Sequence, residues 1–323
     1  MLFGIRCSEG SMLFNDALEQ VMMAENLGYE SVWLGEHHGF DNYWPSPQIA
    51  LAAFAARTTK VRLGTNILIL PLANPIRLAG EWALLDQISD GRVTLGVGMG
   101  WSREEFQALD VPYERRGVRL EEYVVLLKRL WTEENVSFDE STYQLENFTL
   151  TPRPVQKPHP PIWIGGRSPR NIARAARLGD AWVPDAAASI DELASAKTVY
   201  DEALRVEGRE AEIKERPTTR HVILGKTNAE AWERAKPYFE GAYALHLKRG
   251  NPLVASAYSS NLEEFVRGRY IVGDAEACAD EIIGMREILG ITNLAVKFAA
   301  RITPHEAADD MRLFAEKVVP RVG

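Results

Sequence analysis

Cysteine, basic charge and long apolar runs are all scarce in this sequence of 323 residues. The two cysteines, Cys7 and Cys278, sit at opposite ends of the chain, so we expect free thiols in a reducing compartment rather than a disulfide framework. Acidic residues outnumber basic ones by 45 to 37, which argues against a general nucleic-acid binder. The apolar run at 67–70 is far shorter than the roughly 18 residues of a membrane span, and residues 1–6 lack an export signal. We therefore expect a cytoplasmic protein without nucleic-acid or membrane partners.

The bulk composition is that of an ordinary globular protein, with 46% apolar and 25% charged residues. This apolar content excludes a disordered chain, which has too little apolar surface to offset the entropy lost on folding. A chain of this length buries about 75% of its extended surface, so its core needs no disulfide or metal. We expect a single domain over residues 1–323.

Strand-like and helix-like segments alternate along the chain. Short apolar strands are expected at about 2–6, 31–35, 61–70, 93–97, 161–165, 181–183, 219–224 and 291–298. Eight strand–helix units favour a (β/α)8 TIM barrel, an α/β fold whose parallel strands are buried on both faces. The alternative is a doubly wound open sheet, which shows the same local alternation.

Local signals mark where the helices between these strands begin and end. Capping residues followed by proline open two helices, at Asn74-Pro75 and Ser168-Pro169. Capping boxes begin at Ser189 and Thr227, Asp274 caps a later helix, and Gly28 and Gly290 close helices. A plain barrel needs about 250 residues. The excess length falls in two insertions, residues 136–161 before strand five and residues 238–270 after strand seven.

Catalytic groups of such barrels lie at the carboxyl ends of the strands, which directs attention to four loops. These loops carry Glu36-His37-His38 after strand two, Thr65-Asn66-Ile67 after strand three, Gly96-Val97-Gly98-Met99-Gly100 after strand four, and Gly165-Gly166-Arg167-Ser168 after strand five.

The loop after strand five has the composition of a phosphate site. Its glycines allow a ligand close to the backbone, and the helix that follows presents free N–H groups and a favourable dipole. Arg167 and Ser168 add side-chain donors. The alternative is a glycine-rich turn with a capping serine and a surface arginine. Two further arginines on the same helix, Arg174 and Arg177, are expected on its solvated outer face.

The remaining motifs leave alternatives open. The glycines at 96–100 do not complete a dinucleotide fingerprint, because Trp101 stands where the third glycine belongs. His37 and His38 are adjacent and so point to opposite faces of a strand, which argues against a shared metal. One pocket-facing histidine beside Glu36 suits acid–base catalysis, with a structural histidine or a metal-dependent barrel hydrolase as alternatives.

Together these segments resemble the bacterial-luciferase-like flavin-dependent monooxygenases over nearly the whole chain. The similarity is weakest over 186–270. It is carried by 28–38, by 63–75, by 85–98, by Pro161-Ile162-Trp163-Ile164-Gly165-Gly166, by Val272-Gly273-Asp274 and by Gly290-Ile291.

The resemblance implies a barrel that binds reduced FMN, or the deazaflavin F420 in sister branches, and oxygenates a small organic substrate with O2. It implies that His37 is the catalytic histidine, that the Asn66–Ile67 peptide is cis and supports the flavin ring, and that Arg167 and Ser168 hold its phosphate. The other positions that it places at the cofactor are Glu36, Thr65, Gly98, Met99, Arg116, Gly165 and Gly166. Gly98 and Met99 replace a cysteine and an arginine of luciferase, so light emission is not implied.

The resemblance also implies partners. A separate flavin reductase supplies the reduced FMN, because the chain has no nicotinamide fingerprint, and a homodimer forms through residues 74–88. Residues 238–270 fall where the family has a mobile loop, so we expect a lid there. Trp101 favours an apolar substrate. A non-catalytic flavin-binding subunit is the remaining alternative, which the presence of His37 disfavours.

Overall fold

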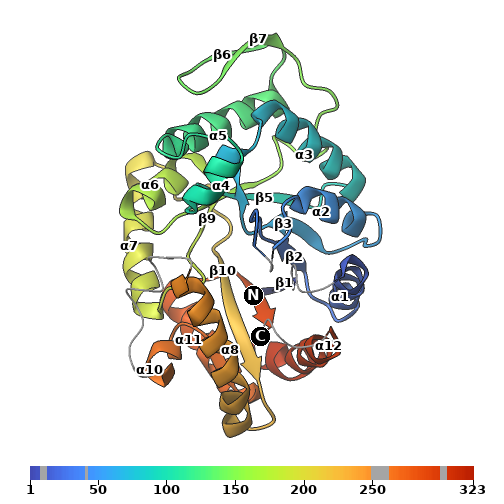
Figure 1. Ribbon diagram of the computed structural model, residues 1–323, viewed down its shortest axis with the longest axis vertical. Helices are drawn as coiled ribbons and strands as arrows, with labels where there is room; N and C mark the ends of the chain where they lie inside the picture. Colours follow the sequence, from blue (N-terminus) through green and yellow to red (C-terminus); the bar gives the residue numbers. More distant parts are fainter. Residues whose placement is uncertain (8–12, 41–42, 249–261, 299–303) are drawn as a thin grey trace.

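The computed structural model describes residues 1–7, 13–40, 43–248, 262–298 and 304–323. A curled parallel sheet lies at the centre with helices around it, and a small hairpin projects at the top (Figure 1). The strands are β1 (Leu2–Arg6), β2 (Ser31–Leu34), β3 (Arg62–Thr65), β4 (Leu68–Ile69), β5 (Val93–Gly98), β6 (Val136–Asp139), β7 (Gln144–Phe148), β8 (Ile162–Gly165), β9 (Ala181–Val183), β10 (Pro217–Leu224), β11 (Ile271–Gly273) and β12 (Asn293–Phe298).

Helices cover the outside of this sheet. They are α1 (Phe14–Asn26), α2 (Pro47–Ala55), α3 (Pro75–Ser89), α4 (Arg103–Ala108), α5 (Arg116–Thr132), α6 (Pro169–Leu178), α7 (Ile190–Glu207), α8 (Asn228–Lys248), α10 (Leu262–Val266), α11 (Ala275–Leu289), α12 (Pro304–Leu313) and α13 (Val319–Val322), with short turns η1 (Leu70–Leu72) and η2 (Phe314–Val318). None of the described helices is long and apolar enough to cross a membrane.

The strand order identifies the architecture. Paired neighbours run β11-β10-β12-β1-β2-β3-β5-β8-β9, so the last strand lies beside the first. The strands from β1 to β9 on this path follow in chain order, whereas β11 lies outside β10. A doubly wound sheet requires a reversal of this order, which the described strands do not show. The expected α/β fold with a TIM-barrel-like curled sheet is confirmed. Between β9 and β10, however, the described residues form no strand pairing, although the two strands contact each other.

The capping signals behave largely as expected. The Asn74 side chain accepts hydrogen bonds from the N–H groups of Ile76 and Arg77, and Ser189 forms a reciprocal capping box with Glu192. Asp274 caps α11, and Gly28 and Gly290 have the positive φ angles of helix-closing glycines. At Thr227 the box is incomplete, because the Glu230 side chain accepts from Lys226 instead of the capping residue.

Several segments differ from the prediction. The third strand is interrupted at Asn66 and Ile67, so that β3 pairs with β2 and β5, whereas β4 pairs with β5 alone. The first insertion contains the antiparallel hairpin β6–β7, which stands away from the sheet (Figure 1). Helix α4 was not expected. Within the second insertion, residues 249–261 lie outside the described residues, so the lid stays a prediction.

Aromatic rings fill the inside of the barrel. Trp33 and Trp163 stack with ring centroids 4.6 Å apart, and Ala181, Val183 and Ala295 surround them. This packed layer closes the barrel below the strand ends, where the candidate site lies. Cys7 and Cys278 are both buried, and neither forms a disulfide, in agreement with the expectation.

Candidate functional site

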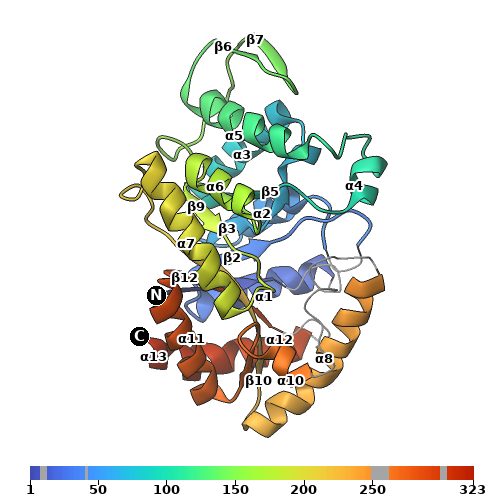
Figure 2. The same ribbon diagram turned by 90° about the vertical axis from the view of Figure 1, so that its left-hand side faces the viewer.

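The loops singled out from the sequence gather at one end of the barrel. The chain termini lie on one side of the molecule and α4, which follows β5, lies on the other (Figure 2). Since β1 begins at the N-terminus and the sheet is parallel, the α4 side is where the strands end. Glu36, His37 and His38 follow β2 on this side, next to the turn between β3 and β4.

His37 is held by a buried carboxylate that the sequence analysis missed. Its Nδ1 lies 3.1 Å from both carboxylate oxygens of Glu105, whose side chain is only 1% exposed. The same carboxylate accepts the backbone N–H of His38 at 2.6 Å. Because an ionised carboxylate only accepts, we assign the His37 proton to Nδ1, which leaves Nε2 as the basic nitrogen. Among the described residues, nothing hydrogen-bonds to Nε2 of His37.

Three aromatic rings surround the His37 imidazole. The ring centroids of Phe40 and Tyr43 lie 4.5 Å from that of His37, and the centroid of Trp101 lies 5.8 Å away. The side chain of His37 is 15% exposed. A partly exposed imidazole with one fixed nitrogen and an apolar surround is the arrangement that proton transfer requires.

His38 points to a different carboxylate. Its Nε2 lies 3.2 Å from Glu36 Oε1, and this hydrogen bond raises the pKa of His38 although burial opposes the shift. The other Glu36 oxygen accepts the Ile69 N–H at 2.5 Å, so Glu36 anchors β4. The two histidines therefore diverge, and no cluster of three metal-ligating side chains occurs within the described residues. The Glu36 carboxylate is engaged by these two partners, so its expected role at a cofactor stays a prediction.

The turn after β3 has the expected cis peptide between Asn66 and Ile67. Thr65 is fully buried, and its hydroxyl donates to the Gly96 carbonyl and accepts the Gly96 N–H. The Thr65 side chain therefore supports the turn, and its expected role at a cofactor stays a prediction. The Asn66 amide donates to Thr219 Oγ1 at 2.8 Å, which ties the turn to β10 across the barrel.

The glycines of β5 and β8 make room for Ile67. A Cβ at Gly98 would lie 2.1 Å from Ile67 Cδ1, and one at Gly165 would lie 2.9 Å from the same atom. Contact with Ile67 is one reason for glycine at both positions, and the expected role of Gly98 at the flavin ring stays a prediction. A ring at this position would rest on Ile67.

The loop after β8 forms a capped helix start. Ser168 caps α6 by accepting the Asn171 N–H, and the Gly166 carbonyl accepts a hydrogen bond from the Trp182 indole. The guanidinium of Arg167 pairs with Asp185 at 3.5 Å and with Glu192 at 3.1 Å, and its expected contact with a phosphate stays a prediction.

Arg174 is buried, so the expectation that it lies on the solvated outer face of α6 is wrong. It is 4% exposed and donates from Nε to Glu121 and from Nη1 to Asn171 Oδ1. Its Nη1 also contacts Met99 Sδ at 3.2 Å, and its Nη2 lies 3.2 Å from the position that a Cβ at Gly117 would take. Arg174 therefore reaches from the second turn of α6 under the loops that follow β5 and β8. Arg177 is 44% exposed, in agreement with the expectation.

Arg116 begins α5 beside this group. Its guanidinium carbon lies 3.7 Å from the Tyr113 ring centroid, and Nη1 donates to the Tyr113 carbonyl. Its Nε is buried without a hydrogen-bond partner. The next residue, Gly117, lies beside Met99, because a Cβ there would be 3.5 Å from Met99 Sδ. Arg116 is thus a positive group with an unused buried donor, and its expected place at the cofactor stays a prediction.

The sequence carried one usable signal for the missed carboxylate. Ser102 and Glu105 have the spacing of a capping box, and the Ser102 side chain does accept the Glu105 N–H. The Glu105 side chain, however, leaves the helix start and turns to His37 and His38. The partner lies 68 residues away in the chain, so local spacing could not reveal it. No comparable signal marked the burial of Arg174.

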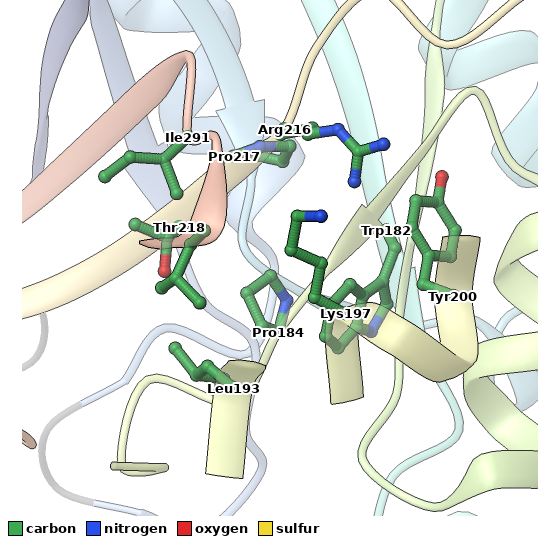
Figure 3. Close-up of a pocket in the computed structure, with 10 residues that line it drawn as sticks. Trp182, Pro184, Leu193, Lys197, Tyr200, Arg216, Pro217, Thr218 and Ile291 are labelled. Atoms are coloured by element: carbon green, nitrogen blue, oxygen red, sulfur yellow. The ribbon is translucent and has the colours of Figure 1, made fainter. Parts of the chain in front are cut away.

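A pocket lies elsewhere, between α7 and the start of β10 (Figure 3). The ammonium of Lys197 points toward the Arg216 guanidinium, and both cations pair with Asp201 at 2.6 and 2.7 Å. Arg216 and Pro217 mark the N-terminal end of β10, the wrong end for barrel catalysis. We therefore place the candidate site at the histidine loop. The other lining residues are Trp182, Pro184, Leu193, Tyr200, Thr218, Leu289 and Ile291.

Comparison with known proteins adds the family context. The family model described as luciferase-like monooxygenase matches residues 1–292. An FMNH2-dependent dimethylsulfone monooxygenase of Pseudomonas putida is 37% identical over 131 residues, which are 40% of this chain and 36% of that protein. The chain spans about half the length of the uncharacterized mycobacterial relatives that it matches.

Solved structures match over the full length. The monooxygenase RslO1 from Streptomyces bottropensis has a TM-score of 0.87 and 28% identity, with 100% of both chains covered. An F420-dependent secondary alcohol dehydrogenase, solved with an F420-acetone adduct, has a TM-score of 0.84 and 22% identity, with 100% of this chain and 99% of that one covered. The second likeness concerns the fold alone.

The carboxylate contacts predict opposite tautomers for the two neighbouring histidines. In the neutral form of each ring, His37 carries its proton on Nδ1 and His38 carries its proton on Nε2. Nitrogen-15 chemical shifts of the imidazole rings measure this, with His38 as the internal control. Glu105→Gln removes the preference at His37 and leaves His38 unchanged. The same tautomer at both rings would contradict the assignment.

Proposed function

Because the chain belongs to the luciferase-like monooxygenase family, we propose that it is the oxygenase of a two-component system. It uses reduced FMN and O2 to oxygenate a small organic substrate, and a separate flavin reductase supplies the reduced FMN. The observation that carries this proposal is the His37–Glu105 pair at the barrel mouth, where a buried carboxylate fixes one imidazole nitrogen and leaves the other available. The relative named for FMNH2 supports the choice of cofactor.

The residues at the strand ends fit a flavin. The cis turn at Asn66–Ile67 offers an apolar side chain as a support for the ring, flanked by Gly98 and Gly165, which carry no side chains to obstruct it. Reduced FMN, when bound, supplies the two electrons with which one oxygen atom of O2 is reduced to water while the other enters the substrate. The protein's part is to bind the ring, exclude water and move protons.

His37 is proposed as the residue that moves those protons. Its Nε2 accepts a proton during the reaction and returns it, and the Glu105 carboxylate stabilises the charged imidazolium by 3.1 Å contacts in a buried setting. The aromatic rings of Phe40, Tyr43 and Trp101 limit the access of water to this proton.

The phosphate is proposed to bind where α6 begins. Ser168 and the α6 N-terminus provide donors, and Arg174 lies beneath them with Nη2 beside the space left by Gly117. Arg167 was expected to take this role from the resemblance. Its pairs with Asp185 and Glu192 would have to break first, so we propose Arg174 as the main charge and Arg167 as secondary.

An F420-dependent hydride transfer on the same barrel is the second candidate, because the F420-dependent dehydrogenase shares this fold over the full chain. A non-catalytic flavin-binding subunit is disfavoured, since the buried Glu105 serves the imidazole directly. We also propose a homodimer through α2 and α3, where Ile49, Leu84 and Ile88 are exposed apolar side chains at 71%, 50% and 44%.

Cofactor binding tests the proposed function. Reduced FMN is expected to bind to the purified protein more tightly than reduced F420, by at least tenfold, in anaerobic titrations. Oxidation of the reduced FMN by O2 in the presence of protein should then be followed by absorbance, with bovine serum albumin as the control. Tighter binding of F420 would favour the F420-dependent hydride transfer. Binding of neither cofactor would overturn both candidate functions.

Replacement of His37 should separate catalysis from binding. His37→Ala is expected to lower the turnover number about 10²- to 10⁴-fold, the usual contribution of a general acid–base group, with little change in FMN affinity. His159→Ala is the matched control, because His159 contacts the Pro160 carbonyl and the Trp131 ring, neither of which belongs to the candidate site. Equal losses of turnover and FMN affinity in His37→Ala would contradict the assigned role.

The phosphate proposal predicts a difference between two arginines. Arg174→Met should reduce FMN affinity about tenfold or more and leave riboflavin affinity nearly unchanged, because only FMN carries the phosphate. Arg167→Met should have the smaller effect. Arg177→Met is the control, since this exposed arginine shares Glu121 with Arg174. A larger effect at Arg167 would restore the original assignment.

A further inference from the structure

Lys297 is a cation inside the barrel that no element of the proposed function uses. It is the penultimate residue of β12 and is 8% exposed. Ala295, two residues earlier, belongs to the interior cluster around Trp33 and Trp163. Residues two apart on a strand face the same side, so Lys297 points into the barrel above the aromatic layer.

The ammonium group of Lys297 lacks a counter-charge. Within the described part of the chain, Nζ makes no hydrogen bond or ion pair. It lies 5.7 Å from the centroid of the Tyr43 ring. The two carboxylates at the barrel mouth are committed elsewhere, Glu36 to His38 and Glu105 to His37. Burial of an unpaired charge is unfavourable. Proteins retain such a group where a ligand supplies the opposite charge.

A second cation stands at the same level. Parallel pairing places Ile5 of β1 opposite Val296 of β12. The next residues on the two strands, Arg6 and Lys297, therefore lie at the same level in the barrel. The Arg6 guanidinium carbon lies 5.5 Å from the same Tyr43 ring. His221 of β10 pairs with Lys297 in register and is the neighbour on the other side. Three nitrogen-bearing side chains therefore occupy one level on adjacent strands β1, β12 and β10.

The cofactor phosphate does not account for these cations. Its proposed site follows β8, and β1, β2, β3 and β5 separate β8 from β12 in the sheet. The two positive regions therefore lie on different sides of the barrel mouth. One anion at α6 leaves Lys297 without an opposite charge among the described residues.

We propose that the substrate is an organic monoanion whose carboxylate or sulfonate group binds Lys297 and Arg6. The apolar part of this substrate rests against Tyr43 and extends toward His37, whose ring centroid lies 4.5 Å from that of Tyr43. This inference rests on the proposed function for the identity of the site and replaces the apolar substrate expected from Trp101. It assigns substrate recognition to Lys297, with Arg6 as the second donor.

Paired probes of equal shape test the charge requirement. Naphthalene-2-carboxylate and naphthalene-2-sulfonate are titrated into flavin-free protein by calorimetry, with neutral naphthalene-2-carboxamide as the comparison. Both anions are expected to bind at least tenfold more tightly than the amide. Lys297→Met removes this preference and Lys297→Arg retains it. Lys197→Met is the control, because this lysine pairs with Asp201 in the distant pocket and should behave as wild type.

Thermal stability gives an independent readout. Without ligand, Lys297→Met should match or exceed the melting temperature of the wild type, because it removes a buried charge that has no partner. A lysine that is paired within the fold would instead lose stability. Naphthalene-2-carboxylate should raise the melting temperature of the wild type and not that of Lys297→Met.

These outcomes are separable from the cofactor test. Equal affinities for the anions and the amide, failure of both anions to bind, or a preference that survives Lys297→Met would each overturn the proposal, whatever the result with FMN. A loss of FMN affinity in Lys297→Met with the anion preference intact would assign the lysine to the cofactor instead. Failure of FMN to bind while the anion preference holds would leave the substrate class standing and reject the monooxygenase.

Discussion

The arrangement at the barrel mouth depends on one buried carboxylate. Glu105 accepts hydrogen bonds from the His37 ring and from the His38 backbone, so a single side chain orients the imidazole and fixes the loop that carries it. A carboxylate that is almost inaccessible to water keeps its strength as an acceptor, because solvent does not screen it. The loops after β2 and β5, which are distant in the sequence, are thereby joined through the Glu105 carboxylate and the His37 imidazole.

Glu36 provides the matching constraint on the other side of His37. Its carboxylate binds His38 and the Ile69 N–H, so the loop after β2 is also attached to the segment that follows the cis turn. Thr65 and Asn66 extend these attachments to Gly96 and Thr219. The histidine, the ring support and the interior wall are consequently parts of one hydrogen-bonded unit, and each holds the others at the geometry that binding requires.

Local patterns in the sequence were sufficient to predict helices and strands. They were insufficient to predict which distant side chains contact one another. The caps at Asn74 and Ser189 and the strand of residues 181–183 were predicted correctly, because they depend on neighbours a few residues away. The burial of Arg174 and the contact of Glu105 depend on residues more than 50 positions away, which periodicity does not report. Glu36 was expected at a cofactor from the family resemblance; its two oxygens contact His38 and the Ile69 N–H, and its role at a cofactor stays a prediction.

The boundary between β9 and β10 is held together differently from the paired boundaries of the sheet. Among the described residues no backbone pairing joins these two strands, although they contact each other. The buried Arg220 of β10 instead donates to the Ala186 carbonyl just beyond β9. Cohesion at this boundary therefore depends on the identity of side chains, whereas the paired strands are joined by backbone hydrogen bonds, which every residue except proline can make.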